Sequence, residues 1–205
     1  MINRYEVSGS QGEFQPGSDG QVLKNKLGIT SPDEMDDVEL ILLEQLYQQV
    51  FQRAFPEGQI AVSDLKDWHY QWLGNVYDWA GEERSVNLAK GDFHFAAAMQ
   101  IHRLLQKFER DCLVRYTPCN KLDKGELIKA IAVTHVELIL IHPFRDGNGR
   151  LARLLADVMA AQAGCELLDY TQWDREKARY LAAIQQGLAG DYDPIITLVD
   201  GALKS

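Results

Sequence analysis

The residues that could support chemistry lie in one short run of the chain. The run reads HPFRDGNGR over residues 142–150, and Arg153 follows it. Apolar residues at helical spacing stand on both sides, so the run is expected to join two buried helices. Pro143 lacks a backbone donor and disfavours helical geometry at His142, so the first helix should end there.

The glycines and arginines of this run favour an anion-binding site. Gly147 and Gly149 permit positive φ and a close approach of another molecule to the backbone. The second helix should begin at about Arg150, so its free N–H groups and its dipole would face the loop. Asn148 adds side-chain donors, and Arg153 lies one turn after Arg150. This pattern predicts a phosphate cradle that suits a polyphosphate better than a monophosphate.

Two further residues suggest a reaction beyond binding. His142 stands at the entrance of the loop, and histidine is the side chain best suited to accept a proton near neutral pH. Asp146 offers hard oxygen ligands, and Mg²⁺ on phosphates typically takes one or two carboxylates with several waters. Taken singly, each feature fits a helix connector or a packed histidine. Together, they describe an attack on a phosphorus centre.

The run resembles the signature of the Fic family, H-x-F-x-D-G-N-G-R-x-x-R. Every fixed position is met: His142, Phe144, Asp146, Gly147, Asn148, Gly149, Arg150 and Arg153. The related Doc kinases carry Lys in place of the second glycine, and this chain does not. The resemblance covers roughly residues 20–200. It implies an all-α, Fic-like helical bundle with a small β-hairpin flap next to the active-site loop.

Fic proteins mostly transfer AMP from ATP to a hydroxyl group of a target protein. The resemblance therefore implies a protein adenylyltransferase, which uses Mg-ATP and modifies a Ser, Thr or Tyr hydroxyl. It implies that His142 deprotonates that hydroxyl, that Asp146 holds Mg²⁺ and that Phe144 anchors the loop in the interior. The residues expected to hold the phosphates are Gly147, Asn148, Gly149, Arg150 and Arg153.

The segment of about 83–95 is interpreted as the flap. It alternates polar and apolar residues, and the turn signal Lys90-Gly91-Asp92 precedes a second apolar stretch. A hairpin of this kind leaves an edge to which another chain could add a strand. A plain connector is the alternative, but the stretch also resembles the Fic flap, which clamps the target backbone. The residues assigned to target docking are Arg84, Val86, Leu88 and Lys90.

A helix near residues 174–188 carries the candidate contacts to adenosine. In Fic proteins this helix places an aromatic and an amide side chain near the nucleoside, so the resemblance implies Tyr180 together with Gln185 or Gln186. Ordinary packing of Tyr180 and solvent exposure of one glutamine are the alternative.

Composition limits the class of protein. The chain has 205 residues, 46% of them hydrophobic and 25% charged, with a formal net charge of -9, which argues against general nucleic-acid or membrane-surface binding. Three scattered cysteines predict a reducing compartment. We expect no signal peptide and no membrane span. The chain is therefore predicted to be cytoplasmic and bacterial, and secretion into a host stays open.

We expect an N-terminal arm over residues 1–28 and a Fic domain over residues 29–205, with its core signature at 142–153. The first helix should begin at Thr30 or Ser31 and run to about Phe55. Further helices are expected over 63–76, 96–113, 123–142, 150–163 and 174–188, and from Pro194.

Many Fic proteins carry an inhibitory helix with the pattern Ser/Thr-x-x-x-Glu-Gly/Asn, whose Glu pairs with the second motif arginine, here Arg153. Among the Ser and Thr residues, only Thr30 has a Glu four residues later, Glu34, and Met35 follows it. The chain is therefore predicted to lack this inhibitor. Inhibition would then come in trans from a small antitoxin-like partner, which would make the protein a toxin of a toxin–antitoxin pair, or it would be absent.

Three other functions fit parts of the pattern. One is transfer of a different phosphoryl-type group, phosphocholine or phosphate, on the same scaffold. Another is a non-catalytic nucleotide-binding module, although a pure binder would not need His142. The third is a metal-centred hydrolase using His135 and His142, which are seven residues apart, but no H-E-x-x-H pattern accompanies them. Adenylyl transfer is the leading prediction.

Overall fold

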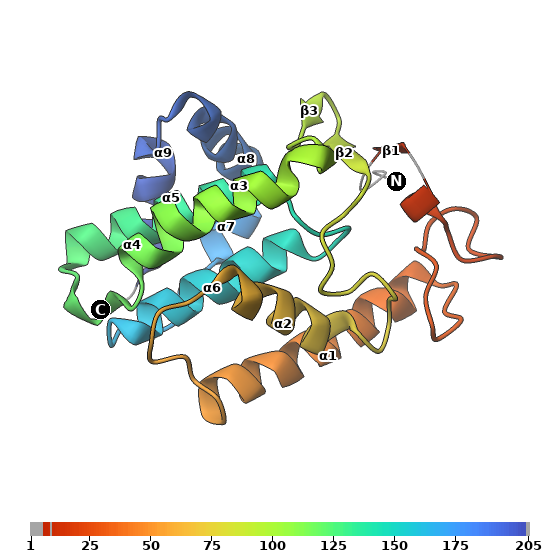
Figure 1. Ribbon diagram of the computed structural model, residues 1–205, viewed down its shortest axis with the longest axis horizontal. Helices are drawn as coiled ribbons and strands as arrows, with labels where there is room; N and C mark the ends of the chain where they lie inside the picture. The colour runs from red at the N-terminus through yellow and green to blue at the C-terminus, as the bar shows by residue number, and fades with distance from the viewer. Residues whose placement is uncertain (1–5, 9, 204–205) are drawn as a thin grey trace. The chain divides into compact units, whose positions relative to one another are not determined.

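The computed structural model describes residues 6–8 and 10–203, and helices dominate it (Figure 1). The helices are α1 (Pro32–Gln52), α2 (Val62–Leu73), α3 (Ile101–Phe108), α4 (Val114–Tyr116), α5 (Lys124–Ile141), α6 (Asn148–Gln162), α7 (Thr171–Arg175), α8 (Lys177–Gln186) and α9 (Asp193–Ala202). The strands are β1 (Glu6–Ser8), β2 (Asn87–Lys90) and β3 (Phe93–His94). The predicted helical fold with a small hairpin is confirmed.

The chain folds as two compact units whose segments alternate along the sequence. One contains the chain up to Phe55 together with Ser63–Leu104 and His142–Gly147. The other contains Pro56–Val62, Leu105–Ile141 and the chain from Asn148 onwards. The boundary passes through the motif between Gly147 and Asn148, so the loop half and the helical half of the motif are described in turn. The division into an arm and a Fic domain stays a prediction.

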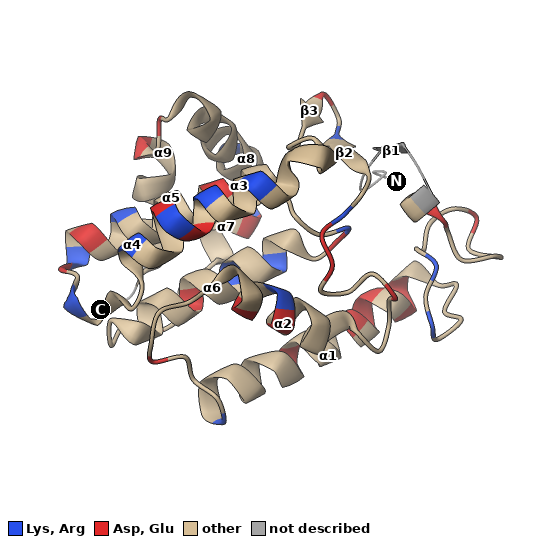
Figure 2. Cartoon of the chain, in the orientation of Figure 1, with Lys and Arg blue, Asp and Glu red and all other residues tan. Residues whose placement is uncertain are grey.

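The start of α1 follows the sequence signals closely. The Ser31 side chain accepts a hydrogen bond from the Glu34 N–H, and Pro32 occupies the first helical position. Acidic residues gather at this end of α1 in Figure 2, where they complement the helix dipole. The helix ends at Gln52, before the expected Phe55.

The flap is part of a three-stranded antiparallel sheet in the order β1-β2-β3. β2 and β3 form the predicted hairpin, and β1 pairs along the other edge of β2, with Val7 opposite Leu88 (Figure 1). We expected an N-terminal arm without regular structure, and this is wrong at β1. The open edge of β2 offers backbone partners to a short polar segment that has no strand pattern of its own.

The second unit is built around α5 and α6. Most side chains of both helices are buried, including Ile131 and Val136 of α5 and Leu154 and Val158 of α6. Gly164 adopts a φ of +79° just after α6, as expected for a glycine that ends a helix. Within the described residues, no helix combines the length and apolarity needed to cross a bilayer.

Candidate active site

The loop of residues 142–147 leaves the helical conformation immediately after α5. His142 has a φ of +51°, in the left-handed region that costs a non-glycine residue about 1–2 kcal/mol. The predicted end of the first helix is therefore confirmed, since α5 stops at Ile141. Contacts from the surrounding unit must hold the loop in this unfavourable conformation.

Phe144 anchors the loop through a buried histidine of α2. The Phe144 ring is 1% exposed and stacks on the His69 ring, with centroids 4.0 Å apart and planes 10° from parallel. The Gly81 N–H donates to His69 Nδ1 at 2.8 Å, so the ring proton lies on Nε2 and is donated to the Asp146 carbonyl at 3.1 Å. His69 is thus a packed histidine, as predicted, and it also fixes the backbone of the motif.

Both the backbone conformation and the space next to Trp72 require a glycine at position 147. Its φ is +79°, and a Cβ atom at this position would lie 2.7 Å from Cζ3 of Trp72. Trp72 is 1% exposed and donates its indole N–H to the Glu39 carbonyl at 2.9 Å, so it cannot easily move aside. Gly147 therefore uses the positive φ that glycine permits.

The His142 imidazole packs against the flap. Its side chain is 4% exposed and stacks on the Phe95 ring, with centroids 3.7 Å apart. Phe95 is itself half-buried and follows β3, and its N–H donates to the Leu88 carbonyl at 3.1 Å. The candidate base and the flap are therefore in direct contact within one unit.

Asp146 lies at the end of the loop half, one residue before the unit boundary. Its side chain is 8% exposed, and Oδ1 accepts a hydrogen bond from the Gly147 N–H at 2.6 Å. The described residues hold no cluster of three or more His, Cys, Asp or Glu side chains that could bind a metal by themselves. A single carboxylate fits an ion held mainly by nucleotide phosphates and water.

The helical half of the motif begins directly after Gly147. α6 starts at Asn148, earlier than the expected Arg150, so Gly149 is helical and does not use the positive φ that glycine permits. Asn148 is 1% exposed, Gly149 is exposed and Arg150 is half-buried. The first N–H groups of α6 have no intrahelical acceptors, which suits an anion at this end.

Arg153 is held by an ion pair and an aromatic ring. Its Nη2 and Nη1 atoms lie 2.6 and 3.3 Å from the two carboxylate oxygens of Asp174, and its guanidinium lies 4.7 Å from the centre of the Tyr170 ring. Burial lowers the pKa of Arg153, but the hydrogen bond and the charge of Asp174 outweigh burial and raise the pKa above its usual value. The Tyr170 hydroxyl donates to Asp157 Oδ1, 2.9 Å away, and lies 3.0 Å from the Arg153 carbonyl.

Tyr180 takes part in a buried polar pair. Its hydroxyl lies 2.8 Å from His135 Nε2, and its ring stacks on Trp173. His135 Nδ1 lies 3.3 Å from the Ala152 carbonyl, so the ring proton is on Nδ1 and Nε2 accepts from Tyr180. Both ring nitrogens of His135 are therefore engaged, which argues against the metal-hydrolase alternative. Gln185 and Gln186 are exposed, and their predicted contacts stay predictions.

The flap residues differ in their exposure. Arg84, Val86 and Leu88 are buried, at 2%, 3% and 2% exposed, and Lys90 is half-buried. The Arg84 side chain donates to backbone carbonyls instead of lying on the surface. Sequence reasoning missed the supporting roles of Arg84 and Phe95, since no spacing rule links the flap to a loop about 50 residues later.

In this mostly helical protein, a loop that begins with His142 leads directly into the N-terminus of α6. The family model described as "Fic/DOC family" matches residues 59–160. The chain belongs to the Fic/DOC family, as its motif predicted.

Curated relatives and solved structures agree with this assignment. The chain is 27% identical over 180 residues to "Probable protein adenylyltransferase y4lH" of Sinorhizobium fredii, covering 88% of this chain and 89% of that protein. It is 29% identical over 201 residues to the protein adenylyltransferase VbhT of Bartonella schoenbuchensis, covering 97% of this chain but 40% of VbhT. The BepC effector of Bartonella tribocorum, solved with AMPPNP, shares the fold, with a TM-score of 0.75 at 22% identity, over 95% of this chain and 97% of that chain.

Proposed function

We propose that this protein is an adenylyltransferase that moves AMP from Mg-ATP to a Ser, Thr or Tyr hydroxyl of a target protein. The observation that carries the proposal is the complete motif, with His142 at its start and the N-terminus of α6 within it. Several curated relatives are named protein adenylyltransferase, which supports this class of enzyme.

The reaction is a single displacement at the α-phosphorus. His142 takes the proton of the target hydroxyl as its oxygen attacks, so the new phosphoester bond forms while the bond from the α-phosphorus to the bridging oxygen breaks. Pyrophosphate carries away the electron pair of the broken bond. Asn148, Gly149, Arg150 and Arg153 would hold the phosphates, with Gly147 at the turn, and the charged side chains would offset the charge that builds up on the leaving group.

Asp146 is the residue that would hold Mg²⁺ bound to the nucleotide. When bound there, the ion would neutralise negative charge on the phosphates. The fit rests on a carboxylate already oriented by the Gly147 N–H.

The flap is proposed to bind an extended segment of the target by backbone pairing. β1 covers one edge of β2, and among the described strands β3 pairs only with β2. An incoming strand would therefore use the outer edge of β3 or replace β1. The docking contacts proposed from sequence are Arg84, Val86, Leu88 and Lys90; the burial of the first three favours recognition through main-chain groups.

Labelled ATP tests the reaction type. A lysate incubated with the purified chain should gain label from the α-phosphate and none from the γ-phosphate, and His142→Ala should nearly abolish the signal. Label from the γ-phosphate alone would make the protein a kinase and reject adenylyl transfer. A modified protein whose mass increase matches phosphocholine would favour that alternative.

Regulation is proposed to come in trans, from a small antitoxin-like partner in the bacterial cytoplasm. The sequence departure at Met35 supports it, because the chain lacks the complete intramolecular inhibitory pattern. Strong transfer by the purified chain, unchanged by Glu34→Gly, is the expected result. A large gain in transfer on Glu34→Gly would instead identify Glu34 as an internal inhibitor.

A further inference from the structure

Arg84 joins three separate stretches of backbone. Its Nε donates to the His142 carbonyl at 2.6 Å, its Nη1 to the Val86 carbonyl, and its Nη2 to the Ala96 carbonyl at 2.6 Å. Val86 precedes β2 and Ala96 follows β3, so the side chain holds both ends of the flap. One guanidinium therefore ties the flap to the residue proposed as the general base.

The backbone of Arg84 adds a fourth bond to the same loop. Its N–H donates to the Pro143 carbonyl at 2.8 Å, next to the carbonyl that its side chain binds. The peptide groups on either side of Pro143 are thus both fixed by Arg84. This explains how His142 keeps its left-handed backbone conformation, which sets the direction of the imidazole.

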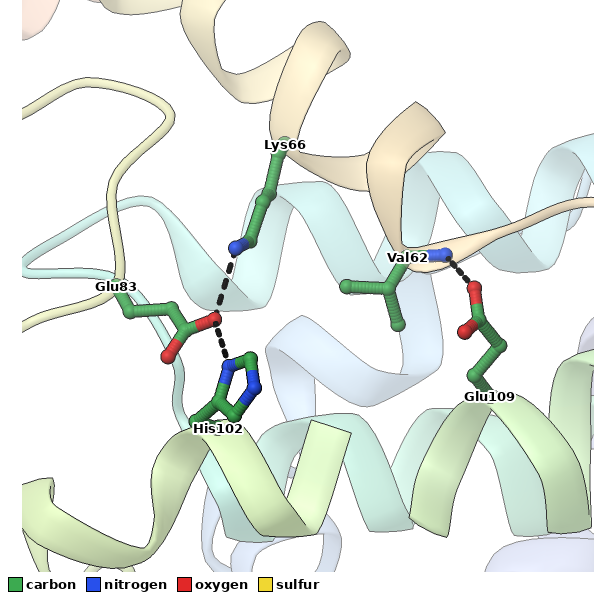
Figure 3. A network of polar contacts seen from close by, with 5 residues as sticks. All are labelled: Val62, Lys66, Glu83, His102 and Glu109. Atoms are coloured by element: carbon green, nitrogen blue, oxygen red, sulfur yellow. Dashed lines mark hydrogen bonds and ion pairs between the residues drawn. The ribbon is translucent and has the colours of Figure 1, made fainter. Parts of the chain in front are cut away.

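The flap also contacts the imidazole itself. The Phe95 ring stacks on the His142 ring at 3.7 Å, and Phe95 is the neighbour of Ala96, whose carbonyl Arg84 binds. Glu83, which directly precedes Arg84, holds the start of the flap. Its carboxylate accepts a hydrogen bond from Lys66 Nζ at 2.8 Å and lies 3.4 Å from His102 Nδ1 (Figure 3). Backbone and ring of His142 are therefore both set by the flap.

We propose that Arg84 is a positioning residue, which fixes the His142 imidazole against the flap so that a hydroxyl docked on the flap meets the base. The proposal rests on the proposed role of His142 as the base. A misplacement of about 1 Å in a reacting group can cost about 10²-fold in rate, so such a brace has a kinetic effect without touching substrate.

A lysine at position 84 should not be able to make the hydrogen bonds that Arg84 makes. Arginine carries five N–H donors in a rigid planar fork that reaches carbonyls in several directions, whereas lysine offers one point charge. Burial, together with the charge of Arg145, lowers the pKa of Arg84 to about 10, so the guanidinium stays protonated at neutral pH. The matched control is Arg103→Lys, since Arg103 is exposed on α3.

The test compares Arg84→Lys with Arg103→Lys and the parent, using α-labelled ATP and lysate protein as acceptor. For Arg84→Lys we expect the maximal rate to fall about 10- to 100-fold. We also expect the KM for ATP and the affinity for AMPPNP to stay within about twofold, because the phosphate-binding residues are not altered. NMR should show that the His142 ring protons lose the upfield shift caused by Phe95, and the control should match the parent throughout.

Several results would overturn the proposal. Transfer by Arg84→Lys at the rate of the parent would overturn it. An unchanged chemical shift of the His142 ring protons would also overturn it. A loss of AMPPNP affinity as large as the loss of transfer would overturn it too, because it indicates general disruption of the fold. If Arg84→Lys does not fold, Phe95→Leu tests the contact between the flap and the His142 ring, with an expected fall in maximal rate of at least about tenfold. Parent-like transfer by Phe95→Leu would contradict the proposal. Full transfer by His142→Ala would instead refute the proposed function.

Discussion

The two halves of the motif are stabilised in different ways. The loop half is buried and held by rings and neutral main-chain groups: His69 on Phe144, Phe95 on His142, and a main-chain carbonyl bound by Arg84. The helical half holds Arg153 by a partly exposed ion pair with Asp174. Buried, specific packing resists change, whereas an exposed pair contributes only about 0–1 kcal/mol. We therefore expect a rigid site for the proposed proton transfer and an adjustable site for the phosphates.

The largest effect should come from removing the proposed base. His142→Ala should lower transfer by about 10²–10⁴-fold and leave AMPPNP affinity nearly unchanged, because the imidazole is proposed to act on the target hydroxyl and not on the phosphates. Transfer assays with α-labelled ATP, together with calorimetric titration of AMPPNP, check both parts. A loss of analogue affinity as large as the loss of transfer would erase the distinction between the two halves.

Two glycines of the motif should respond in opposite ways. Gly147→Ala should destabilise the fold by about 2–4 kcal/mol, since it combines unfavourable positive φ with a close contact to Trp72. Gly149→Ala is the matched control for stability, because Gly149 is helical, exposed and has no atom within 4 Å of the added Cβ. It should be neutral or more stable by up to about 1 kcal/mol. Denaturant unfolding measures both changes, and equal effects would contradict the claim that the loop is the tightly packed half.

The buried pair of His135 and Tyr180 should make the free energy of unfolding depend on pH. Burial lowers the pKa of His135 to about 4, below its usual value of 6.5, so the unfolded chain binds this proton more readily than the folded one. The resulting stability is fully present above about pH 6.5 and is lost as the pH falls through 4. The loss attributable to His135 should be roughly 2–4 kcal/mol.

His135→Gln separates this contribution from other titrating groups. Glutamine can still accept from Tyr180 and donate to the Ala152 carbonyl, but it does not titrate. Unfolding free energies measured at about pH 7 and about pH 4.5 should therefore differ less in the variant than in the parent. If the free energy of unfolding changed equally with pH in both proteins, His135 would not be buried in its neutral form.

The smallest effect is expected at the ion pair. Asp174→Asn should raise the affinity for AMPPNP by about two- to fivefold, because the carboxylate would compete with the phosphates proposed to bind the Arg153 guanidinium, and an exposed pair is worth at most about 1 kcal/mol. Titration at low and high salt measures the change, which should shrink as salt screens the pair. Weaker binding of AMPPNP by Asp174→Asn would show that Asp174 orients Arg153. The helical half would then be as rigidly pre-organised as the loop half.

Sequence by itself determined the features that depend on neighbouring residues. Ser31 and Pro32 mark the start of α1, Pro143 follows the end of α5, and the glycines mark turns, because capping and φ preferences act over one to four residues. The unbroken motif also determined the family. These signals need no knowledge of distant contacts, so they could be recognised in the chain alone.

Only the tertiary structure decided what holds these residues in place. Arg84 is predicted from sequence to face a target, yet folding buries it against carbonyls near the flap and at His142. β1 acquires its strand conformation from the edge of β2, and His69 gains its proton assignment from Gly81. Each of these depends on hydrogen-bond partners far away in the chain, and the need to satisfy buried donors, not local propensity, selects them.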